Sequence, residues 1–433
     1  MREPPGARPP WLSRHWHHLA LLVVALLSGL HFRYTHGQSW HYFVTGARTL
    51  FCENAPSQAC GLHVYASHPD LQIGPLSFVV AALVVWWPGD DGLKLACIAM
   101  MLAGLLALLI VEYNAYRSVE RADRPRLQRR VFLAGLVFLP AWADLAVHFA
   151  HLDDVLALVF TAWAVRAVGR ERPVEVGLAL SLATISKPWA IAFLPLVLAL
   201  PARRWTAAAY ALIPTALVAL PFLLADPHTL TAASFGIPNA AASALRVLGV
   251  SSPLTPQWDR PAQFALGMLL GVLAVRRQRW PAIVMVAATA RIVLDPGVYS
   301  YYTAALLLGT LIWDLQARRG RVIPIWTWAV FAALFAARYL PVQPAVLGVV
   351  RLAVCAGIVI CALVVSRPVG RMLAALPVPL TAGAGSRDQG DRPRGSRMLG
   401  ALRRKGALHD SRRAPAAPGV ADRRSRARVP PAS

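Results

Sequence analysis

Long apolar stretches separated by short polar ones make up most of this chain. Several of these stretches approach the ~20 consecutive apolar residues that cross a bilayer as a helix, which excludes an ordinary soluble domain. We therefore predict an all-α polytopic membrane protein, with about 11 to 12 transmembrane helices within residues 17–366. The predicted spans are 19–30, 93–111, 131–147, 152–167, 205–224, 262–275, 281–294, 300–316, 322–338 and 344–366, and a hairpin of two short helices at 174–200.

The composition supports a membrane protein, and the positions of the arginines explain the high positive net charge. Of the 433 residues, 57% are hydrophobic and 15% are charged, and the formal net charge is +23. Such a charge is typical of nucleic-acid binding, but here the arginines lie in short loops between apolar stretches and in the last part of the chain. This distribution follows the positive-inside rule, so we predict no nucleic-acid partner. Residues 367–433 are rich in Arg, Pro, Ala and Gly, which predicts a disordered basic cytoplasmic tail.

The basic loops also predict a topology. The first span has arginines before it and no cleavage motif after it, so we expect residues 1–16 to stay in the cytoplasm and residues 33–70 to form an outer loop. Residues 73–87 then cannot span, because the next basic loop must lie inside after only one more crossing. We place them as an interfacial helix, and the remaining spans put both termini in the cytoplasm of a cell-membrane protein. The loops expected inside are 117–130, 166–172, 203–204, 276–279 and 318–321.

His151-Leu152-Asp153-Asp154 interrupts two apolar stretches and is the most informative polar site. An Asp at the centre of a membrane helix costs roughly 2.5 to 3.5 kcal/mol, so such groups usually face a cavity or a surface. The predicted topology puts this site on the outer face. If the helix continues to residue 154, the spacing places Asp144, His148, His151 and Asp154 along one face. A solvated helix end is the simpler alternative.

Two further groups of residues lie on the predicted outer side. Lys187, before Pro188, marks the turn of the hairpin, although snorkelling to the interface is an equal alternative. Cys52 and Cys60 share one polar loop and can form a disulfide in an oxidising exterior. The same loop carries four histidines whose spacing matches no usual zinc frame, so the sequence indicates no metal site there. Those histidines are His36, His41, His63 and His68. A divalent metal elsewhere stays open, and no other cofactor is indicated.

The order of these features resembles the GT-C superfamily of membrane glycosyltransferases. It is most similar to the actinobacterial mannosyltransferases that depend on polyprenyl-phosphate-mannose. The resemblance covers roughly residues 17–340. It rests on a first span, an outer loop leading to Gly74-Pro75-Leu76, an interfacial helix, the His-Leu-Asp-Asp turn and the hairpin ending at Lys187-Pro188. The resemblance implies inverting transfer of a sugar, expected to be mannose, from a polyprenyl-phosphate donor to a glycan or glycolipid acceptor outside the membrane.

Site residues follow partly from this resemblance. It implies an acidic base early in the outer loop, where this chain has Gln38 and Ser39. The candidate bases are instead Asp153, Asp154, Asp70 and His41. The donor phosphate and sugar are expected to contact Lys187, Arg291, His151, Tyr42, Tyr65 and Tyr301, with Arg246 and Arg260 in reserve. An ion pair between Arg291 and Asp295, and an aromatic belt at Tyr299, Tyr301 and Tyr302, are the alternatives for those residues.

Two other functions remain open from the sequence. A relative of the same fold could bind or transport a lipid-linked glycan without transferring the sugar. An unrelated polytopic transporter is a third hypothesis, but the chain shows one broken hairpin where transporter repeats usually show a matched pair.

Overall fold

The computed structural model describes residues 10–53, 59–317 and 322–365, all of which belong to one compact unit, Met1–Pro377. The described part is mostly helical and has no strand, although Pro238 and Leu254 form an isolated bridge. The predicted basic loop at 318–321 and the predicted tail at 367–433 lie outside the described residues. The all-helical prediction is therefore confirmed for the described residues.

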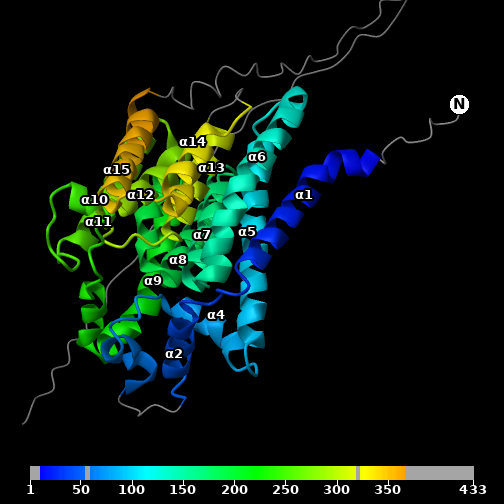
Figure 1. Cartoon of the computed structure of the whole chain (residues 1–433). Coiled ribbons are helices and arrows are strands. Elements are labelled where there is room, and N and C mark those ends of the chain that lie inside the picture. The colour runs from blue at the N-terminus through cyan, green and yellow to red at the C-terminus, as the bar shows by residue number, and fades with distance from the viewer. Residues whose placement is uncertain (1–9, 54–58, 318–321, 366–433) are drawn as a thin grey trace, which may run out of the picture. The chain divides into compact units, whose positions relative to one another are not determined.

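The helices follow one another along the chain as labelled in Figure 1. The α-helices are α1 (Pro10–His31), α2 (Trp40–Leu50), α3 (Val64–Ser67), α4 (Pro75–Val85), α5 (Asp91–Tyr116), α6 (Arg124–Ala143), α7 (Leu152–Val168), α8 (Pro173–Ser186), α9 (Arg204–Ala225), α10 (Ala244–Val247), α11 (Asp259–Arg276), α12 (Ile283–Leu294), α13 (Tyr302–Gln316), α14 (Ile325–Val330) and α15 (Pro344–Ile360). Short 3-10 and π segments are η2 (Gly61–His63), η3 (Arg121–Asp123), η4 (Asp144–His148), η5 (Pro188–Ala199), η6 (Pro227–Ser234), η7 (Trp280–Ala282), η8 (Phe331–Phe335), η9 (Ala336–Tyr339) and η10 (Cys361–Val365).

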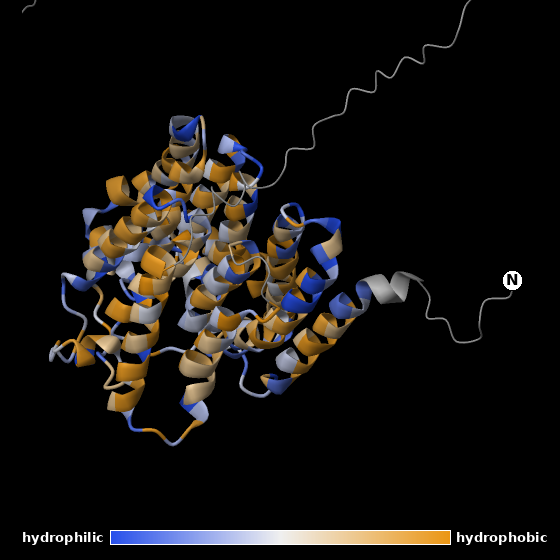
Figure 2. Ribbon diagram, turned by 90° about the horizontal axis from the view of Figure 1, so that it is seen from above, coloured by the Kyte–Doolittle hydropathy of each residue, from blue (hydrophilic) through white to orange (hydrophobic). Residues whose placement is uncertain are grey.

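Four described helices are long and apolar enough to cross a membrane, judged by length and composition. Figure 2 shows that apolar residues cover most of the helical ribbons, whereas hydrophilic residues gather mainly at helix ends and connections. Helical segments also occupy the other stretches predicted as spans, many of them shorter than a full crossing. The four are Asp91–Tyr116, Arg121–His148, Arg204–Ala225 and Pro344–Val365.

The predicted outer loop 33–70 contains helix α2, which was not predicted from the sequence. Trp40, Phe43 and Ala47 recur every three or four residues and form its buried face. Cys52 and Cys60, beyond the end of α2, are joined by a disulfide. The loop is therefore a packed element tied to the bundle, and its buried face lies against α4.

The helix does not continue to residue 154, so the condition under which Asp144, His148, His151 and Asp154 would share one helix face is not met. Helix α6 widens into the π segment η4 and ends, and Ala150 adopts a left-handed backbone with φ +52°. Helix α7 then begins at Leu152, so the direction of the chain changes between His148 and His151. Asp153 and Asp154 consequently lie in the first turn of a new helix, where the helix dipole favours negative charge.

Helix α8 ends one residue before Lys187, as the hairpin prediction required. The residue before a proline is disfavoured in helical conformation, and Lys187 is extended, with φ −145° and ψ 112°. Gly74 lies against this break and donates its backbone N–H to Ser186 O at 3.0 Å. A Cβ at Gly74 would lie 2.0 Å from Ile185 O, so only glycine permits this approach. The Gly74-Pro75 pair thus begins α4 directly beside Lys187.

Candidate functional site

A buried cluster of charged and aromatic side chains forms where the two chain breaks meet. The break before α7 contributes His151, Asp153 and Asp154, and the break after α8 contributes Lys187. Arg291 reaches the same place from α12. All five side chains are buried or nearly so, with side-chain exposures of 0 to 12%. We call these five residues the charged cluster.

Asp153 is the most completely paired carboxylate of the charged cluster. Lys187 Nζ donates a hydrogen bond to its Oδ2, and His151 Nδ1 lies 3.2 Å from its Oδ1. The backbone N–H of Asp154 also donates to Oδ1, at 2.8 Å. Both oxygens therefore have partners, and Asp153 is suited to hold Lys187 and His151 in place.

Asp154 differs because one of its oxygens has no hydrogen-bond partner among the described residues. Its Oδ1 accepts hydrogen bonds from Trp189 Nε1 at 2.9 Å and from Arg291 Nη1 at 3.4 Å. Its Oδ2 is buried and has no hydrogen-bond partner among the described residues, although Lys187 Nζ is 3.6 Å away and His151 Nδ1 is 3.7 Å away. Among the carboxylate oxygens of the charged cluster, this one therefore has an unused capacity to accept a hydrogen bond.

Arg291 lies between two aromatic rings. Its Cζ is 4.3 Å from the centroid of the Trp189 ring and 4.2 Å from that of Tyr302. Cation–π contacts of this kind strengthen when the cation is desolvated. Its Nε is also 3.7 Å from Asp295 Oδ2, so the local ion pair exists, but Arg291 contacts Asp154 as well. Burial raises the pKa of Asp295, which lies in the loop after α12, against the lowering effect of Arg291.

Tyrosines close one side of the charged cluster. The Tyr301 ring stacks on His151 with centroids 4.0 Å apart, and Tyr302 contacts Tyr301 at 4.5 Å. Both tyrosines are 8% exposed, whereas Tyr299 is 40% exposed. Tyr301 and Tyr302 therefore pack inward as part of the site, and Tyr299 is the ring that reaches the surface.

Asp144 connects the two loops that carry these groups. It is fully buried and accepts hydrogen bonds from Arg338 at 3.1 and 2.9 Å, one to each oxygen. Ser300, next to Tyr301, donates to Asp144 Oδ2 at 2.5 Å. The bidentate pair with Arg338 joins the π segment before His151 to η9. The hydrogen bond from Ser300 joins the same segment to the loop before α13.

The beginning of the outer loop is hydrogen-bonded to the segment before His151. The backbone N–H groups of residues 37, 38 and 39 donate to the carbonyls of Val147, His148 and Phe149 at 2.9, 3.0 and 2.9 Å. Gln38 and Ser39, where the resemblance implies an acid, therefore lie within a few residues of the charged cluster. This pairing was not predictable from the sequence, because hydrogen bonds between distant backbone segments leave no local pattern.

Other predicted site residues lie outside the contacts of the charged cluster. His41 and Tyr42 are exposed on α2, with ring centroids 4.0 Å apart, and Asp70 is exposed in a turn. Tyr65 donates its hydroxyl to Ile73 O at 2.7 Å, and burial raises its pKa. Arg246 hydrogen-bonds to loop carbonyls, and Arg260 to Gln72.

Trp189 contacts the charged cluster although we did not predict it. It follows Lys187-Pro188 in the sequence, and only that position could have identified it.

The ligand geometry of the charged cluster fits a metal ion, but its charge does not. Ligand atoms of His151, Asp153 and Asp154 lie within 4.8 Å of one another, as a metal site requires. Lys187 and Arg291 already neutralise these carboxylates, so a cation would have to displace an ammonium or guanidinium group. We interpret the charged cluster as a buried ion-pair network.

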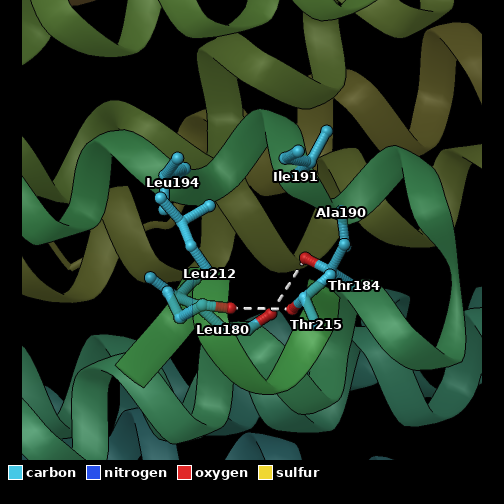
Figure 3. Close-up of a pocket in the computed structure, with 8 residues that line it drawn as sticks. Leu180, Thr184, Ala190, Ile191, Leu194, Leu212 and Thr215 are labelled. Carbon is cyan, nitrogen blue, oxygen red and sulfur yellow. Dashed lines mark hydrogen bonds between the residues drawn. The ribbon is translucent and has the colours of Figure 1, made fainter. Parts of the chain in front are cut away.

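An apolar pocket lies between α8, η5 and α9, next to the hairpin that carries Lys187 (Figure 3). Its two hydroxyl groups, of Thr184 and Thr215, donate to carbonyls of their own helices. The pocket therefore offers mainly apolar contacts. It is lined by Leu180, Thr184, Ala190, Ile191, Leu194, Ala211, Leu212 and Thr215.

Comparison of this chain with protein-family models, with curated proteins and with solved structures found no match.

Proposed function

We propose that this protein is a membrane glycosyltransferase of the GT-C type. It transfers a sugar, which the sequence resemblance indicates is mannose, from a polyprenyl-phosphate donor to a glycan or glycolipid acceptor on the outer side of the cell membrane. The observation that carries this proposal is the charged cluster, which places a carboxylate oxygen without a hydrogen-bond partner beside two buried cations. Inverting transfer from a lipid phosphate needs this combination of a base and a phosphate-binding cation.

Each group then has a role in the proposed reaction. Asp154 Oδ2 takes the proton of the acceptor hydroxyl. At the same time the acceptor's own oxygen forms a bond to the anomeric carbon of the sugar. The bond from this carbon to the phosphate oxygen breaks, and the lipid phosphate leaves with the electron pair. Lys187 and Arg291 stabilise the phosphate, exchanging part of their contact with the aspartates for contact with the leaving group. Asp153 holds Lys187 and His151 in position.

A second candidate function is binding of a lipid-linked glycan without transfer. Two observations favour it: Gln38 and Ser39 stand where the resemblance implies an acid, and both cations are already paired with carboxylates. In this alternative the donor phosphate displaces the carboxylates and remains bound, and no bond in the donor breaks.

A transfer assay separates the two functions. Purified protein is incubated with polyprenyl-phosphate-mannose and a panel of glycan and glycolipid acceptors, and free lipid phosphate and mannosylated product are measured. The transferase proposal requires product in amounts that exceed the enzyme. Saturable binding of the donor with no product would support the second function, and absence of binding would contradict both.

We also propose that α4 lies at the outer interface and that α5 is the second span, with both chain termini in the cytoplasm. Helix α4 has 11 residues, about 17 Å of helix, which is too short for a hydrocarbon core of ~30 Å. The disulfide between Cys52 and Cys60 suits an oxidising exterior.

This topology is tested with single introduced cysteines and an impermeant maleimide. We expect a cysteine near residue 90 to react only with reagent added outside, and a cysteine near residue 120 only with reagent added inside. Labelling of both from the same side would contradict this topology.

A further inference from the structure

A second group of chemistry-bearing side chains joins the first helix to α5, separate from the charged cluster. His17 Nε2 lies 3.2 Å from Glu112 Oε1, and His18 Nε2 lies 2.9 Å from Glu112 Oε2. His17 is fully buried and the Glu112 side chain is 5% exposed, whereas the His18 side chain is 35% exposed. We call these three residues the His-His-Glu group.

The convergence of the two histidines is not a consequence of helix geometry alone. Adjacent residues on an α-helix project about 100° apart, since the helix has 3.6 residues per turn. In α1, however, the rings of His17 and His18 approach to 3.9 Å between centroids, and both Nε2 atoms reach the same carboxylate. Two imidazole nitrogens and a carboxylate thus face a common point.

The buried charge of Glu112 needs compensation. A carboxylate removed from water is costly unless a positive charge or several hydrogen bonds offset it. In the part of the chain that the structure describes, the ion-pair partners of Glu112 are the two imidazoles, and neither lysine nor arginine is among them. Among the described side chains, compensation therefore comes from a proton on a histidine, unless a bound cation supplies it.

We propose that the His-His-Glu group binds one divalent transition-metal cation of the Zn²⁺ type. Imidazole nitrogens and a carboxylate oxygen are ligands that Zn²⁺ prefers, and donors about 2.0–2.1 Å from the metal in tetrahedral geometry lie roughly 3.3 Å apart. The observed separations of 3.2 and 2.9 Å are close to this value, and ligand atoms of the three residues lie within 4.8 Å of one another. Three protein ligands leave the fourth position for water.

The site would clamp α1 to the end of α5. Glu112 lies in the last turns of that helix, just before the basic connection at 117–130, which the proposed topology places in the cytoplasm. Coordination through Nε2 puts the remaining ring proton of His17 on Nδ1, which is buried and has no partner among the described residues. We therefore expect affinity in the micromolar range, weaker than that of a closed four-ligand structural site.

The test is titration of Zn²⁺ into the purified full-length chain, carrying an affinity tag without histidines, by isothermal titration calorimetry. We expect wild type to bind one Zn²⁺ per chain, and His18→Ala and Glu112→Gln to weaken this binding at least about 100-fold. His31→Ala is the matched control, because His31 is an exposed histidine at the other end of α1, and it should bind as wild type does. The proposal is overturned if wild type lacks a stoichiometric site or if both ligand variants retain it.

A second measurement distinguishes loss of a ligand from loss of the fold. His18 is partly exposed, so His18→Ala should unfold at nearly the wild-type temperature when metal is removed by a chelator. Added Zn²⁺ should raise the Tm of wild type and leave that of His18→Ala unchanged, since a ligand stabilises only the state that binds it. An equal Zn²⁺-dependent rise in both proteins would contradict the assignment even if Glu112→Gln fails to fold.

Discussion

Lys187→Met is expected to destabilise the folded protein by about 3 to 5 kcal/mol, since it removes the lysine that neutralises the buried carboxylate of Asp153. The Asp153 side chain is fully buried, and that of Lys187 is 12% exposed, so water cannot replace the lost partner. Asp154 loses a cation at 3.6 Å as well. Denaturant unfolding of the purified protein in mixed micelles, followed by tryptophan fluorescence, measures the effect.

Two companion variants make this result specific to the buried pair. Lys187→Met combined with Asp153→Leu removes both charges and should recover at least about half of the lost stability, because an apolar pair often replaces a buried ion pair without cost. Lys94→Met breaks an exposed pair with Asp91, whose side chain is 69% exposed, and should cost no more than about 1 kcal/mol. Equal destabilisation by the single and the double variant would show that Lys187 does not act through Asp153.

Asp154→Asn is expected to lower the rate of sugar transfer by about 100-fold or more, the usual contribution of a general base. The replacement keeps the size of the side chain and an oxygen for Trp189, but an amide cannot take the proton of the acceptor hydroxyl. Donor binding should persist, since Lys187 and Arg291 remain. The transfer assay with polyprenyl-phosphate-mannose, at equal amounts of folded protein, measures the rate, and donor binding is measured separately.

Asp70→Asn is the matched control, because Asp70 is an exposed acid of the outer loop that lies outside the contacts of the charged cluster. It should transfer sugar within about twofold of wild type, as surface substitutions usually have small effects. If Asp70→Asn is inactive and Asp154→Asn is not, the base lies in the loop and the role assigned to Asp154 is wrong. Unchanged turnover in both variants would exclude both acids.

Helix-length apolar stretches and local breaks were predictable from the sequence. The positions of α5, α7 and α9 follow from apolar stretches, and the break at Lys187 follows from Pro188, because proline restricts the residue before it. Helix α2 escaped prediction because its apolar face is short and lies in a loop rich in polar residues. The π segment before Ala150 also escaped prediction, since no residue there is a strong helix breaker.

The sequence by itself determined the helical class and marked His151, Asp153, Asp154, Lys187 and Arg291 as candidate residues, because charges in apolar stretches are costly and therefore conspicuous. Only the tertiary structure decided which of them meet. Lys187 is 34 residues from Asp153, and Arg291 is 137 residues from Asp154. Their contacts depend on how far each helix is rotated and where it breaks. Pro188 marks one break in the sequence, but packing sets the rotation of each helix, which the order of residues along one segment does not record.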